Sequence, residues 1–257
     1  MDETLESYFS KELWMPESPS VKPHTPLQSI LLHLVPGALI TVVYFALLGP
    51  VARAGYPSMM ALILPVVFVL IPVQLGYLLV QGKRLNERLS LKDVISYRQP
   101  IPTWQYFVWV PVLFVAAGLI FTVAKPLDSF LYNNVFSAWP SLQTGLEGGY
   151  EKEVLVRTYI LFAVFVTVLG PTVEELYFRG YLLPRMDYAG KWAPLLHSFL
   201  FALYHLFTPW FFITRTLAML PLIYAVRRKN ITLSIITHVL LNSIDVIVAV
   251  GFIANMT

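Results

Sequence analysis

The sequence predicts an all-α, polytopic membrane protein with about seven transmembrane helices. Of its 257 residues, 57% are hydrophobic and only 13% are charged, whereas a soluble domain carries about 25% charged residues. The mean hydropathy is +0.66, so the chain lacks the polar side chains that a water-exposed surface needs. These values exclude a water-soluble globular enzyme and a disordered chain. Cysteine is absent, which excludes disulfides, thiolate metal sites and a thiol nucleophile.

Seven apolar runs are long enough to cross about 30 Å of hydrocarbon. We expect the spans at 27–51, 58–80, 104–124, 158–183, 192–210, 211–226 and 231–253. Residues 1–26 are polar and acidic and lack the basic region and cleavage site of a secretory signal, which predicts a cytosolic tail. The remainder, 27–257, is expected to be a single transmembrane domain with its longest external loop at 125–153.

The basic residues predict the orientation of the chain. Seven spans with a cytosolic N-terminus place twelve of the eighteen lysine and arginine residues in cytosolic segments, as the positive-inside rule requires. The C-terminus is then expected outside. Because the basic residues lie in short loops, the net charge of +3 reflects orientation, and no nucleic-acid partner is expected.

Polar residues at membrane depth gather in the C-terminal half. A charged side chain there costs roughly 2.5–3.5 kcal/mol on insertion, so each one needs a partner or a function. The fourth span reads E-E-x-x-x-R, with Glu174, Glu175 and Arg179. The i,i+4 spacing predicts an ion pair between Glu175 and Arg179, while Glu174 lies on a different face without a local cation. The alternative is a capping box formed by Thr172 and Glu175.

Two further motifs follow on later spans. The fifth contains F-x-x-x-H, with Phe201 and His205, and the seventh contains H-x-x-x-N, with His238 and Asn242. The i,i+4 spacing places His238 and Asn242 on one helix face, and Asp245 follows on roughly the same side as a supporting partner. The alternative is interhelical polar contact, worth about 0.6 kcal/mol each.

Depth brings these residues together. At 1.5 Å per residue, Glu174, His205, His238 and Asn242 lie within roughly 6 Å of one plane, which predicts that they face one polar cavity among the last four helices. A carboxylate and a histidine can deprotonate water, while a second histidine and an asparagine donate to an oxyanion. These groups suffice for amide hydrolysis without a covalent intermediate. Glu174, His205 and His238 could instead hold zinc, although the H-E-x-x-H signature is absent.

Other intramembrane proteases fit the sequence less well. No serine among Ser198, Ser234 and Ser243 lies in a recognisable nucleophile motif, which disfavours a rhomboid-like dyad. A presenilin-like site needs two intramembrane aspartates, and Asp245 is the only one within the expected spans. His33, in the first span, has no polar neighbours in sequence and is expected to be structural.

At the three motifs the sequence resembles the CPBP intramembrane proteases, also called the Abi or type II CAAX prenyl endopeptidase family. The resemblance covers about residues 155–250, with all three motifs in order. It implies an intramembrane endopeptidase, and it implies that Glu175 and Arg179 are mainly structural.

The resemblance also implies a role for each remaining motif residue. Glu174 is expected to be the water-activating base, assisted by His205, and His238 and Asn242 are expected to form the oxyanion hole. No cofactor is expected, with the zinc-dependent version as the alternative.

The expected substrate is a membrane-bound or lipidated peptide or protein, such as a prenylated CAAX protein. The short chain, and the lack of further histidines directly after His205, point to a prokaryotic plasma membrane. The competing hypothesis is a non-catalytic membrane scaffold or a transporter that uses the same polar cluster. Transporters usually have two related halves with paired broken helices, and the first three spans do not resemble the last four.

Overall fold

The computed structural model describes residues 22–256, so most of the expected tail at 1–26 lies outside the described residues. Within 22–256 the chain is helical and contains no strand. Six helices of this part are long and apolar enough to cross a membrane. They are Pro26–Arg53, Ser58–Asn86, Thr103–Asn134, Lys152–Arg185, Pro209–Arg228 and Ile231–Ala254. The predicted all-α membrane class is confirmed.

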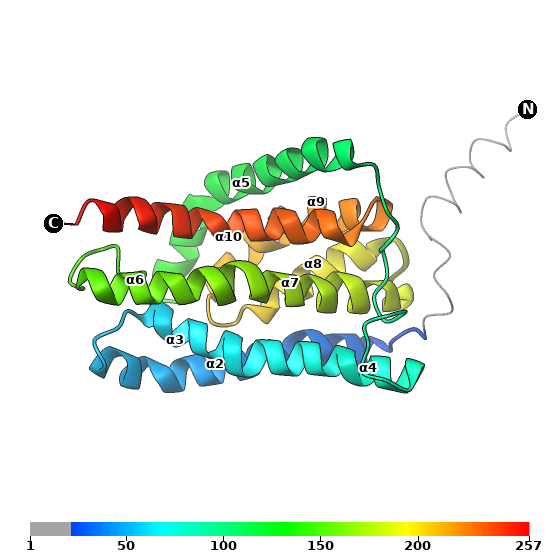
Figure 1. Cartoon of the computed structure of the whole chain (residues 1–257), viewed down its shortest axis with the longest axis horizontal. Helices are drawn as coiled ribbons and strands as arrows, with labels where there is room; N and C mark the ends of the chain where they lie inside the picture. Colours follow the sequence, from blue (N-terminus) through cyan, green and yellow to red (C-terminus); the bar gives the residue numbers. More distant parts are fainter. Residues whose placement is uncertain (1–21, 257) are drawn as a thin grey trace, which may run out of the picture.

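The helices run roughly along one long axis (Figure 1). In chain order the elements are α2 (Pro26–Arg53), α3 (Ser58–Pro65), η1 (Val66–Leu75), α4 (Gly76–Asn86), α5 (Thr103–Asn134), α6 (Lys152–Leu161), η2 (Phe162–Leu169), α7 (Gly170–Glu174), η3 (Glu175–Leu182), η4 (Leu183–Arg185), η5 (Asp187–Trp192), α8 (Ala193–Tyr204), η6 (Pro209–Phe211), α9 (Phe212–Arg228) and α10 (Ile231–Ala254). Two of the long helices contain π-helical stretches, which are η1 in the second and η2 and η3 in the fourth. Such stretches are rare and occur often at functional sites.

Side-chain caps define where the first and last long helices begin. The Thr25 hydroxyl accepts from the backbone N–H of Gln28, whose side chain accepts from the backbone N–H of Thr25. This reciprocal pair is a capping box, and it satisfies donors that the first turn of α2 leaves free. The Asn230 side chain likewise accepts from the backbone N–H of Thr232 at the start of α10, at 2.6 Å.

The third predicted span is shorter than the helix that forms. The sequence predicts its end at residue 124, before Lys125 and Pro126, but α5 continues to Asn134. As a result Asp128 lies inside a helix, 5% exposed, where its carboxylate accepts a hydrogen bond from Thr214 of α9. Packing of α5 against α9 therefore overrides the local preference for a loop.

The fifth predicted span, 192–210, contains a short helix. α8 has twelve residues and reaches about 18 Å, less than the hydrocarbon thickness. It ends inside the bundle, where the chain turns back through η6 into α9 (Figure 1). The first described residues and the C-terminus lie at opposite ends of the bundle, as an odd number of traverses requires. The span count of seven, and the side of the membrane on which each terminus lies, stay predictions.

The outward faces of the long helices are apolar. Phe107 and Val123 of α5 are 78% and 77% exposed, and Ile247 of α10 is 69% exposed. Large apolar side chains on the outside of a helical bundle fit lipid rather than water as the surrounding solvent. The protein is an integral membrane protein.

Candidate active site

A break in backbone hydrogen bonding prepares one edge of the site. In the π-helical stretch η2, the N–H of Gly170 donates to the carbonyl of Phe165, five residues back. The next residue, Pro171, has no N–H, so the carbonyl of Val166 loses the donor that this pattern would give it. Asn242 of α10 takes that place, donating from Nδ2 at 3.1 Å. The third motif is thereby joined to the helix that carries the first.

Glu175 is the hub of the three motifs. It is completely buried, and the predicted ion pair is present, with 3.2 Å between Glu175 Oε1 and Arg179 Nη1. Ser234 donates to Glu175 at 2.5 Å, and Nδ1 of His238 lies 2.8 Å from Oε1. Because a carboxylate only accepts hydrogen bonds, Nδ1 carries the proton. Glu175 therefore fixes the orientation of the His238 ring and leaves Nε2 to face the other way.

Arg179 packs against Phe201, the phenylalanine of the second motif. The guanidinium group is completely buried, and its central carbon lies 3.8 Å from the centroid of the Phe201 ring. An aromatic face attracts a cation, most strongly where both are shielded from water. Phe201 thus packs the α8 motif directly onto the Glu175–Arg179 pair, a contact that spacing along the sequence does not reveal.

Glu174 lies on a different face of the helix from Glu175. It ends α7, is 6% exposed, and lines a cavity. Its Oε2 lies 4.0 Å from Nε2 of His238, and the Tyr204 hydroxyl lies close to its carboxylate. The same hydroxyl accepts from Nε2 of Gln74 at 3.0 Å. The first residue of the motif is thus held from two sides and remains accessible from the cavity.

His205 lies just beyond the end of α8. Its backbone leaves the helical region, with ψ of 50°, and its Nδ1 hydrogen-bonds to the Phe201 carbonyl at 3.0 Å. In the neutral ring this leaves Nε2 as an acceptor. A glycine lets the end of α8 approach α2, because a Cβ at Gly37 would overlap the Tyr204 carbonyl oxygen.

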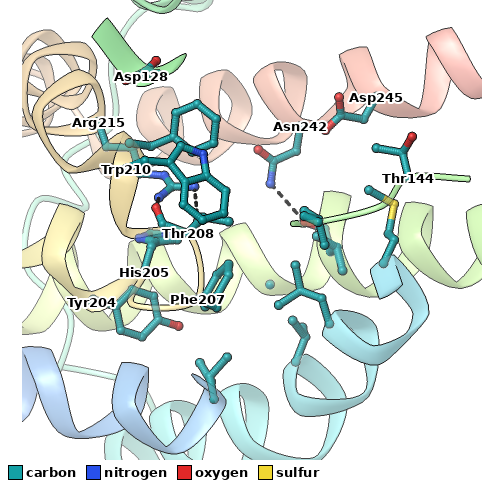
Figure 2. Close-up of a pocket in the computed structure, with 18 of the residues that line it drawn as sticks. Asp128, Thr144, Tyr204, His205, Phe207, Thr208, Trp210, Arg215, Asn242 and Asp245 are labelled. Atoms are coloured by element: carbon teal, nitrogen blue, oxygen red, sulfur yellow. Dashed lines mark hydrogen bonds between the residues drawn. The ribbon is translucent and has the colours of Figure 1, made fainter. Parts of the chain in front are cut away.

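Three of the four predicted catalytic residues line one cavity of about 670 Å³, namely Glu174, His205 and Asn242. His238 lies behind Glu174 and does not line the cavity. In Figure 2, His205 lies on one side of this space and Asn242 on the other. Asp245 lies at its rim, where it is exposed, and no hydrogen bond joins it to Asn242 in the described part of the chain.

The cavity extends beyond the last four helices. Apolar side chains of the first two spans form one wall, including Ile40 of α2, Met59 and Leu62 of α3, and Val66 and Leu70 of η1. The opposite wall carries the polar residues of the motifs, together with Arg215 of α9. The cavity is therefore partly apolar and partly charged, where the sequence predicts a polar one.

The loop at 135–151 lies against the cavity and is itself well ordered by hydrogen bonds. Trp139 donates to the Leu206 carbonyl at 3.0 Å, in the turn that follows His205. Thr144 lines the cavity, and its hydroxyl donates to Glu147 at 2.9 Å. Desolvation raises the pKa of Glu147, but hydrogen bonds from its own backbone N–H and from Thr144 and Gly145 outweigh it and leave the pKa below its ordinary value.

Several alternatives from the sequence are corrected by these contacts. The capping box is wrong, because the Thr172 hydroxyl donates to the Val168 carbonyl within a continuing helix. His33 is not without polar company, since its Nε2 lies 3.0 Å from Nδ1 of His197 in a completely buried pair. These histidines are 164 residues apart in sequence, so only the packing of α2 against α8 brings them together.

The structure contains neither a presenilin-like aspartate pair nor a rhomboid-like serine–histidine dyad within the described residues. Asp128 joins Asp245 as a second cavity-lining aspartate, which the sequence did not indicate, but Figure 2 places them on opposite sides of the cavity. The hydroxyls of Ser198 and Ser243 donate to backbone carbonyls. No serine hydroxyl hydrogen-bonds to a histidine within the described residues, so neither arrangement forms.

The zinc alternative requires three ligand atoms around one point. Ligands about 2.0 Å from a tetrahedral zinc ion lie roughly 3.3 Å from one another. Residues 22–256 contain no group of three histidine, aspartate or glutamate side chains that could hold a metal ion. Glu174, His205 and His238 in particular do not form one.

Comparison with known families agrees with the motifs. Residues 156–244 match the model of a family described as type II CAAX prenyl endopeptidase Rce1-like. The chain carries an Rce1-like region. The resemblance to the CPBP family is thereby confirmed over about the length that the motifs indicated, and it supports a CAAX-type membrane endopeptidase. No curated protein and no solved structure matches the chain.

Proposed function

We propose that this protein is an intramembrane endopeptidase that hydrolyses a peptide bond with water activated by Glu174 and His205. The observation that carries the proposal is the arrangement around one cavity of Glu174, His205 and Asn242, with His238 4.0 Å behind Glu174. The residues come from three helices and lie within the Rce1-like region.

The reaction begins with a water molecule bound between Glu174 and Nε2 of His205. Glu174 takes a proton from the water while its oxygen bonds to the carbonyl carbon of the substrate, forming a tetrahedral intermediate. Asn242, which lines the cavity, donates to the resulting oxyanion, whereas Nε2 of His238 faces Glu174 from behind. When the intermediate collapses, the C–N bond breaks, and the proton on Glu174 passes to the leaving amine.

The buried charges favour this distribution of protons. Glu174 must be ionised to act as a base, and Glu175 is ionised in its pair with Arg179. The Nδ1–H of His238 donates to Glu175 at 2.8 Å. A carboxylate paired with a cation is far less costly in a low-dielectric interior than an isolated ion.

The substrate that suits the cavity is partly apolar. The wall formed by α2, α3 and η1 offers aliphatic side chains beside the polar motif residues, which fits a membrane-associated or prenylated peptide. We therefore propose a CAAX-type substrate that enters from the lipid or from the cytosolic side of a prokaryotic plasma membrane, with the N-terminus of the chain in the cytosol.

The proposal is tested by cleavage with purified, detergent-solubilised protein. A farnesylated CAAX peptide and its unprenylated counterpart are offered to the wild type and to Glu174→Ala, and the products are identified by mass spectrometry. Cleavage by the wild type that is lost in the variant supports the proposal, and the peptide preference defines the role of the prenyl group. If the wild type cleaves neither peptide and the Glu174→Ala variant traps no substrate in membranes, the scaffold or transporter hypothesis is favoured instead.

A further inference from the structure

One charged side chain of the cavity has no role in the proposed hydrolysis. Arg215 lies in the first half of α9, within the span Pro209–Arg228, and lines the same cavity as Glu174 and His205. In Figure 2 it lies beside Thr208 and Trp210, on the side of the cavity that carries His205. An ionisable residue inside a span is expensive to insert and usually marks a functional site.

The contacts of Arg215 leave most of its donors unused. Nη1 donates to the Thr208 carbonyl at 3.1 Å, and Nη2 donates to the Thr208 hydroxyl at 2.8 Å. The guanidinium carbon lies 5.1 Å from the centroid of the Phe211 ring. A guanidinium group has five N–H donors, so two neutral oxygens and an aromatic face leave capacity for a further acceptor.

No carboxylate compensates this charge at close range. Within residues 22–256 no aspartate or glutamate oxygen lies within 4.0 Å of the guanidinium nitrogens of Arg215. Asp128, the nearest candidate on α5, is instead bound by the Thr214 hydroxyl at 2.5 Å. Asp128 and Glu174 act on Arg215 only through longer-range electrostatic attraction.

We propose that Arg215 binds a carboxylate of the substrate. A carboxylate can accept two parallel hydrogen bonds from a guanidinium group, and an anion here would neutralise a charge that the cavity otherwise leaves without a close counter-ion. The carboxylate belongs either to the C-terminus of the peptide or to an acidic side chain near the cleaved bond. This proposal rests on the proposed function and adds a specificity determinant to it.

Thr208 holds Arg215 in position for this contact. Its backbone N–H donates to the His205 carbonyl at 2.9 Å, so one tight turn connects the proposed water-activating histidine to the residue that orients Arg215. Substrate carboxylate and scissile bond thus occupy one cavity, and the peptide bond that is cleaved lies close to the acidic group.

The test uses four farnesylated peptides that form two pairs. The first pair differs only in a free C-terminal carboxylate or a C-terminal amide, and the second has glutamate or glutamine after the cleavage site with an amidated terminus. Loss of a hydrogen-bonded charge partner reduces affinity by about 10- to 100-fold. We expect the wild type to prefer one carboxylate peptide over its neutral partner by this factor in kcat/KM, mainly through KM.

Variants of two cavity-lining cations separate binding from structure. Arg215→Gln is expected to reduce the carboxylate preference to about one, and Arg215→Lys to restore part of it, because lysine keeps the charge but not the planar fork. Lys125→Gln is the matched control, since Lys125 lines the cavity but is exposed at its edge. It is expected to keep the wild-type preference.

Each other outcome overturns the inference. Equal cleavage of carboxylate and neutral peptides by the wild type, or an equal loss for both in Arg215→Gln, would mean that Arg215 only clamps the turn at Thr208. If the preference disappears in Lys125→Gln, the carboxylate binds at the edge of the cavity. If Arg215→Gln has an effect only when anionic lipid is added to the assay, Arg215 binds a lipid headgroup. Failure to cleave any peptide is the failure of the proposed function, and binding of the labelled peptides to Glu174→Gln, measured by fluorescence anisotropy, then decides the inference separately.

Discussion

The first three spans and the Rce1-like region contribute different walls to the same cavity. Residues 156–244 supply the motif residues and Arg215, with Glu175 and Arg179 completely buried behind Glu174, while α5 of the first region adds Lys125 and Asp128. The first two spans supply aliphatic side chains and two supports, which are the close approach at Gly37 and the hydrogen bond from Gln74 to Tyr204.

This difference separates reaction chemistry from the shape of the site. The chemical groups occur as short motifs because each pair must share a helix face, whereas the supports are single residues far away in sequence. A family match confined to 156–244 therefore covers the proposed reaction centre without covering the wall that shapes the substrate. Substitutions in the first region should affect catalysis only by shifting the positions of the reacting groups. Substitutions in the Rce1-like region should remove reacting groups directly.

The largest effect on stability is expected from Arg179→Met. It leaves Glu175 buried without its cation and removes the contact with Phe201, and breaking a buried ion pair costs about 3–5 kcal/mol. Thermal unfolding in detergent should show a strongly lowered midpoint. Arg157→Met, an exposed site on the same long helix, is the control and should change stability by no more than about 0.5 kcal/mol. Equal midpoints for both variants would mean that the Glu175–Arg179 pair is not structural.

Glu175→Gln is expected to reduce kcat by about 10- to 100-fold, as loss of a partner that orients a functional histidine does elsewhere. The amide no longer fixes the orientation of the His238 ring behind Glu174, so the reacting groups lose their alignment while the substrate still binds. Steady-state kinetics should therefore show a lower kcat with little change in KM. Unchanged kcat would remove Glu175 from the positioning of His238.

Gly37→Ala tests the support from the first region. The added methyl group overlaps the Tyr204 carbonyl oxygen, and overpacking of this kind costs about 1–3 kcal/mol. We expect lower stability together with reduced turnover, because the end of α8 and His205 are displaced. Gly118→Ala is the matched control, since nothing lies within 4 Å of its added Cβ. The same loss in both variants would contradict a specific contact between α2 and α8.

The smallest effect is expected from metal removal. Because Glu174, His205 and His238 form no metal-binding group, treatment with a strong chelator should leave the cleavage rate unchanged. Activity that chelation abolishes and added zinc restores would instead assign these three residues to a metal site. The proposed reaction would then be centred on the metal.

Much of this architecture follows from local sequence. The boundaries of α2 and α10 agree with apolar runs of sufficient length, and the Glu175–Arg179 pair follows from i,i+4 spacing on one helix. The extent of α5 does not follow from local sequence, because Asp128 is stabilised by Thr214, which lies 86 residues away on another helix. The end of α8 at Tyr204 was equally hidden, because the apolar run continues through Phe207.

The site was predictable in its residues more than in its contacts. Motif spacing selected Glu174 and His205, but it could not indicate that Phe201 covers Arg179 or that His33 meets His197, because these pairs form only when separate helices pack. The apolar wall was missed for the same reason. Aliphatic residues of a lipid-spanning helix look alike in sequence whether they face lipid, core or cavity.

The most direct test of the account compares two buried carboxylates of the one cavity. Glu174 belongs to the Rce1-like region and Asp128 to the first region, and both line the cavity. Single-turnover cleavage of the preferred peptide should fall by about 10²- to 10⁴-fold in Glu174→Gln, as expected for loss of a general base. Asp128→Asn should stay within about tenfold of the wild type, because its carboxylate only accepts from Thr214. A Glu174→Gln enzyme that keeps wild-type rates, or an Asp128→Asn enzyme that loses them as completely, would contradict the central claim.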